Sequence, residues 1–169
     1  MGFYEGYRDS VTDQYAVKPT DFMVGEVRVE RDITGIKKYV FMQADDAVTA
    51  GQFVKFDMGI TTPHLVAPKA TPTTAVADVC LGLPAGGLAV PDEYYFWCQF
   101  AGVAIGGNVK TGVAAGDPLV CSATAGALQK QTNTTTAPES VCAVAMEANS
   151  SGSDAQKAVR LLGVASIGD

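Results

Sequence analysis

The sequence predicts an all-β fold, a small antiparallel β-barrel or sandwich, and three observations support this prediction. The 169 residues include 18 glycines and 8 prolines, while charged residues make up only 18%, a composition that favours short strands and tight turns over long helices. No stretch combines a 3.6-residue apolar stripe with helix-capping residues. Several short segments instead alternate polar and apolar side chains, or are continuously apolar, as strands are.

Two parts of the chain share one pattern of turns and strands. Residues 46–57 align without gaps on residues 111–122, which places Gly51 on Gly116 and Val54 on Leu119. Glycine is the residue that a turn with positive φ favours, so Gly51 and Gly116 are the predicted turn-forming residues. Residues 100–104 likewise correspond to residues 161–165. We therefore predict two diverged β repeats, about 39–107 and about 108–168. The alternative is chance similarity between short apolar strands.

A strand with one solvated face is expected ahead of the first repeat. Residues 24–30 alternate, with Val27 and Val29 on one face and Glu26, Arg28 and Glu30 on the other. A turn is expected over residues 32–37, followed by another strand over residues 39–42.

The strongest strand signal covers residues 94–105. Tyr95, Trp97 and Gln99 alternate with a second set of side chains that would share the opposite face: Tyr94, Phe96, Cys98 and Phe100. Because both faces carry aromatic rings, we expect this strand to be central, covered on both sides or placed at a subunit interface.

The first 24 residues form a predicted N-terminal arm, followed by a β-domain over residues 25–169. The arm mixes charges with aromatic rings and shows neither helical nor strand periodicity. Tyrosine is a frequent anchor at interfaces, so we expect the arm to bind a neighbouring subunit or a larger surface through Phe3, Tyr4, Tyr7 and Tyr15. The alternatives are an arm folded back on its own domain, or a disordered tail.

Motifs for catalysis and metal binding are not evident in the sequence. The single histidine, His64, follows Thr-Thr-Pro and has no recognisable nucleophile motif, so we expect it in a surface loop. The four cysteines have no CxxC spacing and no adjacent histidine: Cys80, Cys98, Cys121 and Cys142. Zinc ligands usually lie closer in sequence, so we predict buried free thiols and no metal site. A Cys80–Cys142 disulfide is the alternative, if a pseudo-twofold axis relates the repeats.

Two acidic pairs are further candidates for cation binding or paired-carboxylate chemistry. These pairs are Asp45–Asp46 and Asp92–Glu93. Neighbouring residues on a strand point to opposite faces, so we predict solvated turns at both pairs. The sequence therefore predicts neither an enzyme nor a cofactor.

Charge and hydropathy narrow the partners. The net charge is −6, and the 12 basic residues are dispersed, which argues against nucleic-acid binding. No apolar run reaches the length of a membrane span, and no secretory signal is visible at the N-terminus. A charge-poor β-domain of this size often hides surface in an oligomer, so we expect self-association.

Residues 113–120 are followed by Ala125-Gly126-Ala127-Leu128 and later by Leu162-Gly163-Val164-Ala165. This pattern resembles that of the small capsid decoration (cement) proteins of tailed bacteriophages. The resemblance covers residues 39–168 in two loose copies. It implies a β-rich, barrel-like or tulip-like subunit, usually a homotrimer, bound to the major capsid protein on the outside of the expanded head. Such a virion protein would be made in the bacterial host cytoplasm and would stabilise the capsid.

Other classes remain open from the sequence. A carbohydrate- or receptor-binding β-module of a phage fibre or cell surface would use tyrosine rings and Trp97 to stack on sugars. A hydrolase would require His64. A tail or tube protein would form rings or filaments in place of closed trimers.

Overall fold

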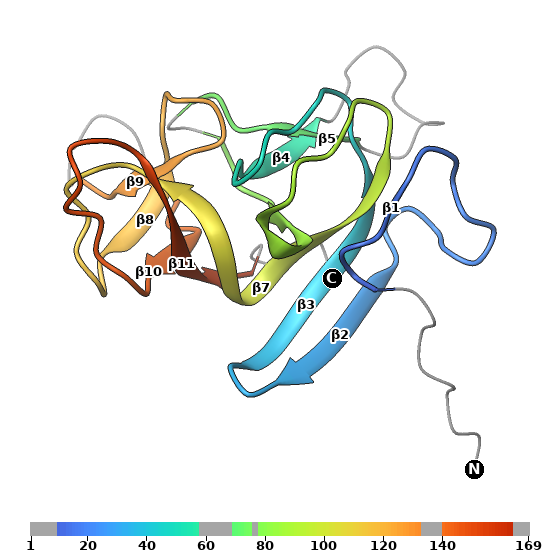
Figure 1. Cartoon of the computed structure of the whole chain (residues 1–169), viewed down its shortest axis with the longest axis horizontal. Helices are drawn as coiled ribbons and strands as arrows, with labels where there is room; N and C mark the ends of the chain where they lie inside the picture. The colour runs from blue at the N-terminus through green and yellow to red at the C-terminus, as the bar shows by residue number, and fades with distance from the viewer. Residues whose placement is uncertain (1–9, 58–68, 76–77, 133–139, 164–169) are drawn as a thin grey trace.

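The structure, a computed structural model, describes residues 10–57, 69–75, 78–132 and 140–163, and it confirms the all-β prediction (Figure 1). Within these residues the regular elements are β1 (Gln14–Tyr15), β2 (Val27–Asp32), β3 (Gly35–Gln43), β4 (Val54–Asp57), β5 (Lys69–Pro72), β6 (Leu83–Pro84), the 3₁₀ turn η1 (Ala85–Gly87), β7 (Tyr95–Val109), β8 (Pro118–Cys121), β9 (Leu128–Lys130), β10 (Ala143–Ala145) and β11 (Ala155–Leu162). None of the described residues forms a helix long and apolar enough to cross a membrane.

Five strands close into a barrel. They are ordered β11-β10-β8-β9-β7, and β11 pairs with β7 to complete the circle. The contact between β7 and β9 is parallel and the other barrel pairings are antiparallel. Closure removes the unpaired edges that an open sheet would leave in this half of the molecule.

Strand β7 is the centre of the fold, as predicted. Its first half pairs with β3 along one edge and with β1 and β6 along the other edge, and its second half pairs with β11. Its side chains alternate between two cores: Phe96 and Cys98 pack with Val40, whereas Trp97 packs with Phe41. The register of β7 shifts once against β3 and once against β11. These irregularities bend the strand so that it serves both the barrel and the β2–β3 hairpin.

The turn of the β2–β3 hairpin is shorter than expected. The sequence placed a turn over residues 32–37, but β3 begins at Gly35 and only Ile33 and Thr34 lie between the strands. The carboxylate of Asp32 accepts hydrogen bonds from the Thr34 amide at 2.7 Å and hydroxyl at 2.5 Å, and its other oxygen lies 2.6 Å from Lys37 Nζ. Asp32 therefore closes a tight turn, and residues 35–38 are free to pair with β2.

The two predicted repeats make corresponding backbone pairs. Val48 bridges to Val90, and its repeat counterpart Val113 bridges to Asn149. Ala101 and Leu162, which correspond in the repeat alignment, lie opposite each other in the antiparallel pairing of β7 and β11. Corresponding residues pair with each other in this way when a twofold axis passes between two copies of one unit, and such an axis fits the described pairings.

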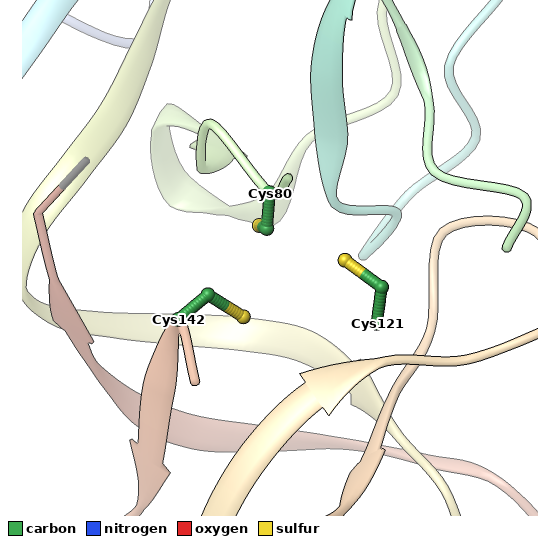
Figure 2. Close-up of side chains that lie close together, drawn as sticks. All are labelled: Cys80, Cys121 and Cys142. Carbon is green, nitrogen blue, oxygen red and sulfur yellow. The ribbon is translucent and has the colours of Figure 1, made fainter. Parts of the chain in front are cut away.

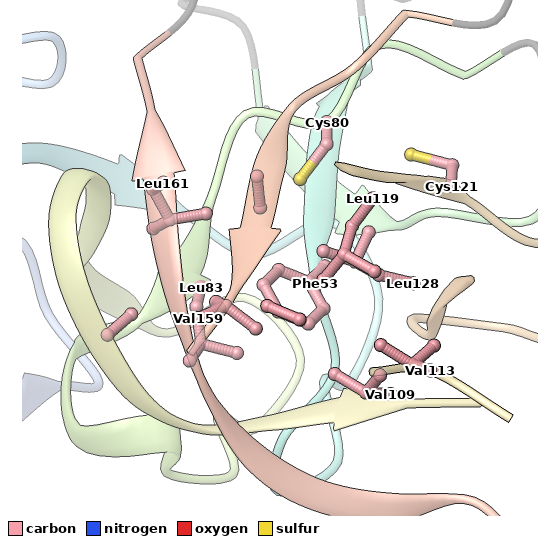
Figure 3. Close-up of a cluster of buried hydrophobic side chains, with 13 residues drawn as sticks. Phe53, Cys80, Leu83, Val109, Val113, Leu119, Cys121, Leu128, Val159 and Leu161 are labelled. Carbon is pink, nitrogen blue, oxygen red and sulfur yellow. The ribbon is translucent and has the colours of Figure 1, made fainter. Parts of the chain in front are cut away.

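The barrel interior is filled by apolar side chains from both halves of the chain (Figure 3). Phe53, which precedes β4, inserts its fully buried ring among residues of the barrel strands. Glycine at position 107 gives this ring its space, because a Cβ there would lie 2.3 Å from Phe53 Cζ. Phe53 of the first repeat thus fills a barrel whose strands β8 to β11 belong to the second repeat.

Candidate functional site

The predicted arm residues fall into two groups. Phe3, Tyr4 and Tyr7 lie outside the described residues. Tyr15 lies in β1, opposite Tyr95 of β7, and its ring centroid is 6.2 Å from that of Phe22. Phe22 is itself 4% exposed. Tyr15 and Phe22 therefore pack against their own domain, which is the folded-back alternative for this part of the arm.

The turn glycines singled out in the sequence both have positive φ. Gly51 has φ +81° and Gly116 has φ +88°. Beyond its backbone conformation, Gly51 is closely packed, since a Cβ there would lie 2.7 Å from Gly106 O. Gly116 has nothing within 4 Å of that position, so only its conformation favours glycine.

Trp97 is not available for stacking on a sugar. Its side chain is fully buried, with its ring centroid 5.1 Å from that of Phe41 and 5.3 Å from that of Phe22. The carbohydrate-binding alternative required an exposed Trp97, and that expectation is wrong. Trp97 and Tyr95 of β7 lie on the same side of the sheet as Tyr39 and Phe41 of β3, and these rings bury one another with Phe22 packed against them.

A lysine lies between one carboxylate of each acidic pair. Lys69 Nζ lies 3.1 Å from Asp45 Oδ1 and 2.7 Å from Glu93 Oε1, so one carboxylate from each pair points at the same ammonium group. The hydrogen bond to Glu93 is the main cause that raises the pKa of Lys69. A cationic side chain therefore occupies the position that a bound cation would take between these two carboxylates.

Strand β2 covers its polar face and exposes its valines. Arg28 lies on the inner side, 2.6 Å from Glu30 and with its guanidinium carbon 6.0 Å from the centroid of the Trp97 ring. Val27 and Val29 consequently point outward and are 51% and 60% exposed. The alternation of the strand was visible in the sequence, but its polar side is the covered one.

This arrangement creates an apolar surface on the hairpin. We define the hairpin surface as the exposed side chains Val27, Val29, Ile33 and Ile36. The basic residues Arg31 and Lys38 lie on the same face as Val29, because they pair with Ile36 and Val29 across the two strands. No acidic residue lies among the paired positions of this face, although the whole chain carries a net charge of −6. In Figure 1 the hairpin extends away from the barrel.

Three of the four cysteines converge at one edge of the barrel core (Figure 2). We call Cys80, Cys121 and Cys142 the thiol cluster; their Sγ atoms all lie within 4.8 Å of one another. Cys121 ends β8, and Cys142 comes directly before β10, where its amide donates to Leu119 O at 2.9 Å. Cys80 lies just before β6 and is held by its neighbour Leu81, whose amide donates to Val54 O at 2.8 Å. The sequence prediction of buried thiols fits Cys80 and Cys121, whereas Cys142 is partly exposed.

Proximity changes the acidity of these thiols. Hydrogen bonds from Cys142 and then from Cys80 lower the pKa of Cys121, because two thiol donors stabilise its thiolate. The same interactions with Cys121, together with burial, raise the pKa values of Cys80 and Cys142. The buried hydroxyl of Thr73 also lowers the pKa of Cys121, and within the described residues it makes no complete hydrogen bond. Among the three thiols, Cys121 is therefore the one whose ionisation the cluster favours.

Sequence spacing alone did not reveal the thiol cluster. Its members lie far apart along the chain, and tertiary pairing of β8 with β10 brings two of them together. The one available signal was the correspondence of Cys80 with Cys142 in the repeats, which predicted proximity of these two but not of Cys121. Cys98 belongs to a separate core cluster, and burial raises its pKa. His64 lies outside the described residues.

Comparison with known proteins adds no relative. No protein-family model matches the chain, and neither a curated protein nor a solved structure shows significant similarity to it.

Proposed function

We propose that this protein is a structural component of a bacteriophage virion that binds the outside of the expanded head and stabilises it by clamping capsid subunits as an oligomer. The observation that carries the proposal is the hairpin surface. It is an outward-facing apolar patch on a paired β-hairpin, in a chain whose composition otherwise suits a β scaffold. The resemblance of residues 39–168 to decoration proteins supplies the partner, the major capsid protein.

The hairpin surface has the character of a protein contact. Val29 is 60% exposed and Ile33 fully so, although each would gain about 1.5 to 3 kcal/mol from complete burial. The paired apolar side chains lie beside Arg31 and Lys38, so the complementary surface is apolar at its centre and acidic at its rim. A second copy of this acidic chain, or an acidic capsid surface, meets that description.

The backbone of β2 adds a second feature. This strand lies at the end of the sheet order and pairs only with β3 among the described strands. An edge strand can accept another strand through its open hydrogen-bonding groups, and the exposed charge of Arg31 limits unspecific pairing. Contact through β2 therefore offers both backbone hydrogen bonds and apolar side chains to a neighbouring subunit.

The mechanism is binding linkage and requires no chemical step. A protein that binds the expanded lattice, and not its precursor, stabilises the expanded state by its binding free energy. If three linked subunits engage three lattice positions, avidity of about 10² to 10⁴ over a single contact makes modest footprints long-lived.

The test is a binding measurement on heads. Expanded heads lacking the protein are mixed with the purified chain and pelleted, the bound copies are counted, and the temperature of head disruption is measured; unexpanded heads provide the control. We expect saturation at three bound copies per threefold lattice position, a higher disruption temperature and little binding to unexpanded heads. Absence of binding to expanded heads would exclude decoration.

A further inference from the structure

The thiol cluster brings three metal-ligating side chains to one point, and the proposed structural role does not use them. We propose that Cys80, Cys121 and Cys142 bind one thiophilic d¹⁰ metal ion, Cu(I) or Zn²⁺, through all three sulfurs. Soft thiolates select these ions over Mg²⁺ or Ca²⁺, which prefer oxygen ligands. The proposal is independent of capsid binding.

The distances suit a single ion. All three Sγ atoms lie within 4.8 Å of one another. A Zn–S bond of about 2.3 Å places tetrahedral sulfur ligands about 3.8 Å apart, so closing the site requires shifts of about 1 Å or less. Side-chain rotation supplies such shifts, while β8 and β10 remain paired. Figure 2 shows the three side chains entering the same space from three separate segments.

Metal binding leaves no backbone acceptor without a donor. The Cys142 thiol donates to Leu119 O at 3.6 Å, and the Cys80 thiol donates to Gly82 O at 4.0 Å. Each carbonyl also accepts from a backbone amide at 2.9 Å, from Cys142 N and Val54 N respectively. When three S–H bonds break and three S–metal bonds form, three protons leave to solvent and both carbonyls keep a partner. No electron is transferred.

A buried hydroxyl beside the sulfurs is an independent sign of a polar ligand. Thr73 is fully buried, and its hydroxyl makes no complete hydrogen bond within the described part of the chain. Cys121 is a polar neighbour of this hydroxyl, and a buried hydroxyl without a well-formed hydrogen bond favours a ligand that completes one. Next to Cys121, the Thr73 hydroxyl can donate to a metal-bound thiolate, or its oxygen can complete a four-coordinate zinc site. Cu(I) needs no such fourth ligand.

Access to the site runs through its least buried member. Cys142 is partly exposed, whereas Cys80 and Cys121 are buried. An ion can therefore reach the cluster from the Cys142 side without separation of the barrel strands. Once bound, it would tie the segment before β6 to β8 and β10, and so connect the two repeats.

The experiment is a competition titration of the full chain, reduced and freed of metal under anaerobic conditions. Cu(I) is supplied as its bicinchoninate complex, and Zn²⁺ is supplied with a chromophoric pyridylazo chelator. We expect one ion per chain, with three sulfur ligands by X-ray absorption: sulfur alone for Cu(I), and sulfur with one oxygen for Zn²⁺. If the protein removes neither ion from its chelator, the proposal is overturned.

Variants separate the cluster from a general effect of losing a buried cysteine. C142A and C121A should each weaken binding at least about 100-fold, since loss of an outer hydrogen-bond partner alone weakens metal sites by about 10- to 100-fold. C98A is the matched control, because Cys98 is also buried but lies in another core cluster, and it should bind as the wild type does. Circular dichroism checks that each variant is folded. C142A has the partly exposed position and provides the decisive arm if C121A does not fold. Unchanged metal binding by C142A, or an equal loss of binding in C98A, would overturn the proposal. So would a reversible mass loss of two hydrogens, the sign of a disulfide, in place of metal uptake.

Discussion

Arg28 lies 2.6 Å from Glu30 on the inner side of β2, and its guanidinium covers the edge of the aromatic core at Trp97. This pair determines the orientation of the strand. Arg28 and Glu30 neutralise each other where they pack over the aromatic rings, while the intervening Val29 faces solvent. The hairpin surface is a direct consequence of that inversion.

Arg28 should contribute through packing as well as charge. R28A removes the contact with the Trp97 ring and exposes the core beneath it, so we expect a loss of about 1 to 2 kcal/mol in the free energy of unfolding. Trp97 is the only tryptophan, so its fluorescence emission reports the change directly and should shift to longer wavelength. R31A is the control, because Arg31 is exposed on the other face of β2, and it should leave both quantities unchanged. Equal effects of the two variants would contradict the inward role of Arg28.

The hairpin surface should control association. V29K places a charge in the middle of this surface, so it should weaken self-association and binding to expanded heads by at least about tenfold while leaving the thermal midpoint nearly unchanged, because Val29 is exposed. Light scattering and head pelleting measure these effects. I105K is the matched control, since Ile105 is 63% exposed on β7 and outside the hairpin. The surface assignment fails if I105K and V29K behave alike.

Gly107 should tolerate no side chain. In G107A the new methyl group would lie 2.3 Å from the Phe53 ring, and this overpacking should cost about 1 to 3 kcal/mol in urea unfolding. G152A is the control, because Gly152 has nothing within 4 Å and should change stability by less than about 0.5 kcal/mol. F53L should partly rescue G107A, and strictly additive effects would show that the two residues do not touch.

Tyr39 predicts a loss of stability in alkali. Burial, with Glu30 and Asp32 nearby, raises the pKa of Tyr39 from 10.0 to about 12. The unfolded chain therefore ionises first, so stability should be constant up to about pH 10 and should then fall by on the order of 2 kcal/mol towards pH 12. Y39F should show a smaller fall over the same range in thermal unfolding. An identical pH profile for both proteins would place the titration elsewhere.

Local pattern determined much of this protein. Alternation in residues 94–105 identified β7, its central position and the separation of its aromatic side chains between two cores. The composition determined the all-β class, because so many glycines and so few charges suit short strands. Gly51 and Gly116 were found by turn chemistry, which depends only on neighbouring residues.

Tertiary structure decided which face of each strand is covered and which distant residues meet. The alternation with a period of two predicts that β2 has two different faces, but packing against the Trp97 core determines that the Arg28 face is the covered one. Sequence spacing separates Cys80, Cys121 and Cys142, and only the packing of the segment before β6 against β8 and β10 brings their sulfurs within 4.8 Å of one another. Long-range pairing carries no local signature, because it depends on the packing free energy of the whole chain.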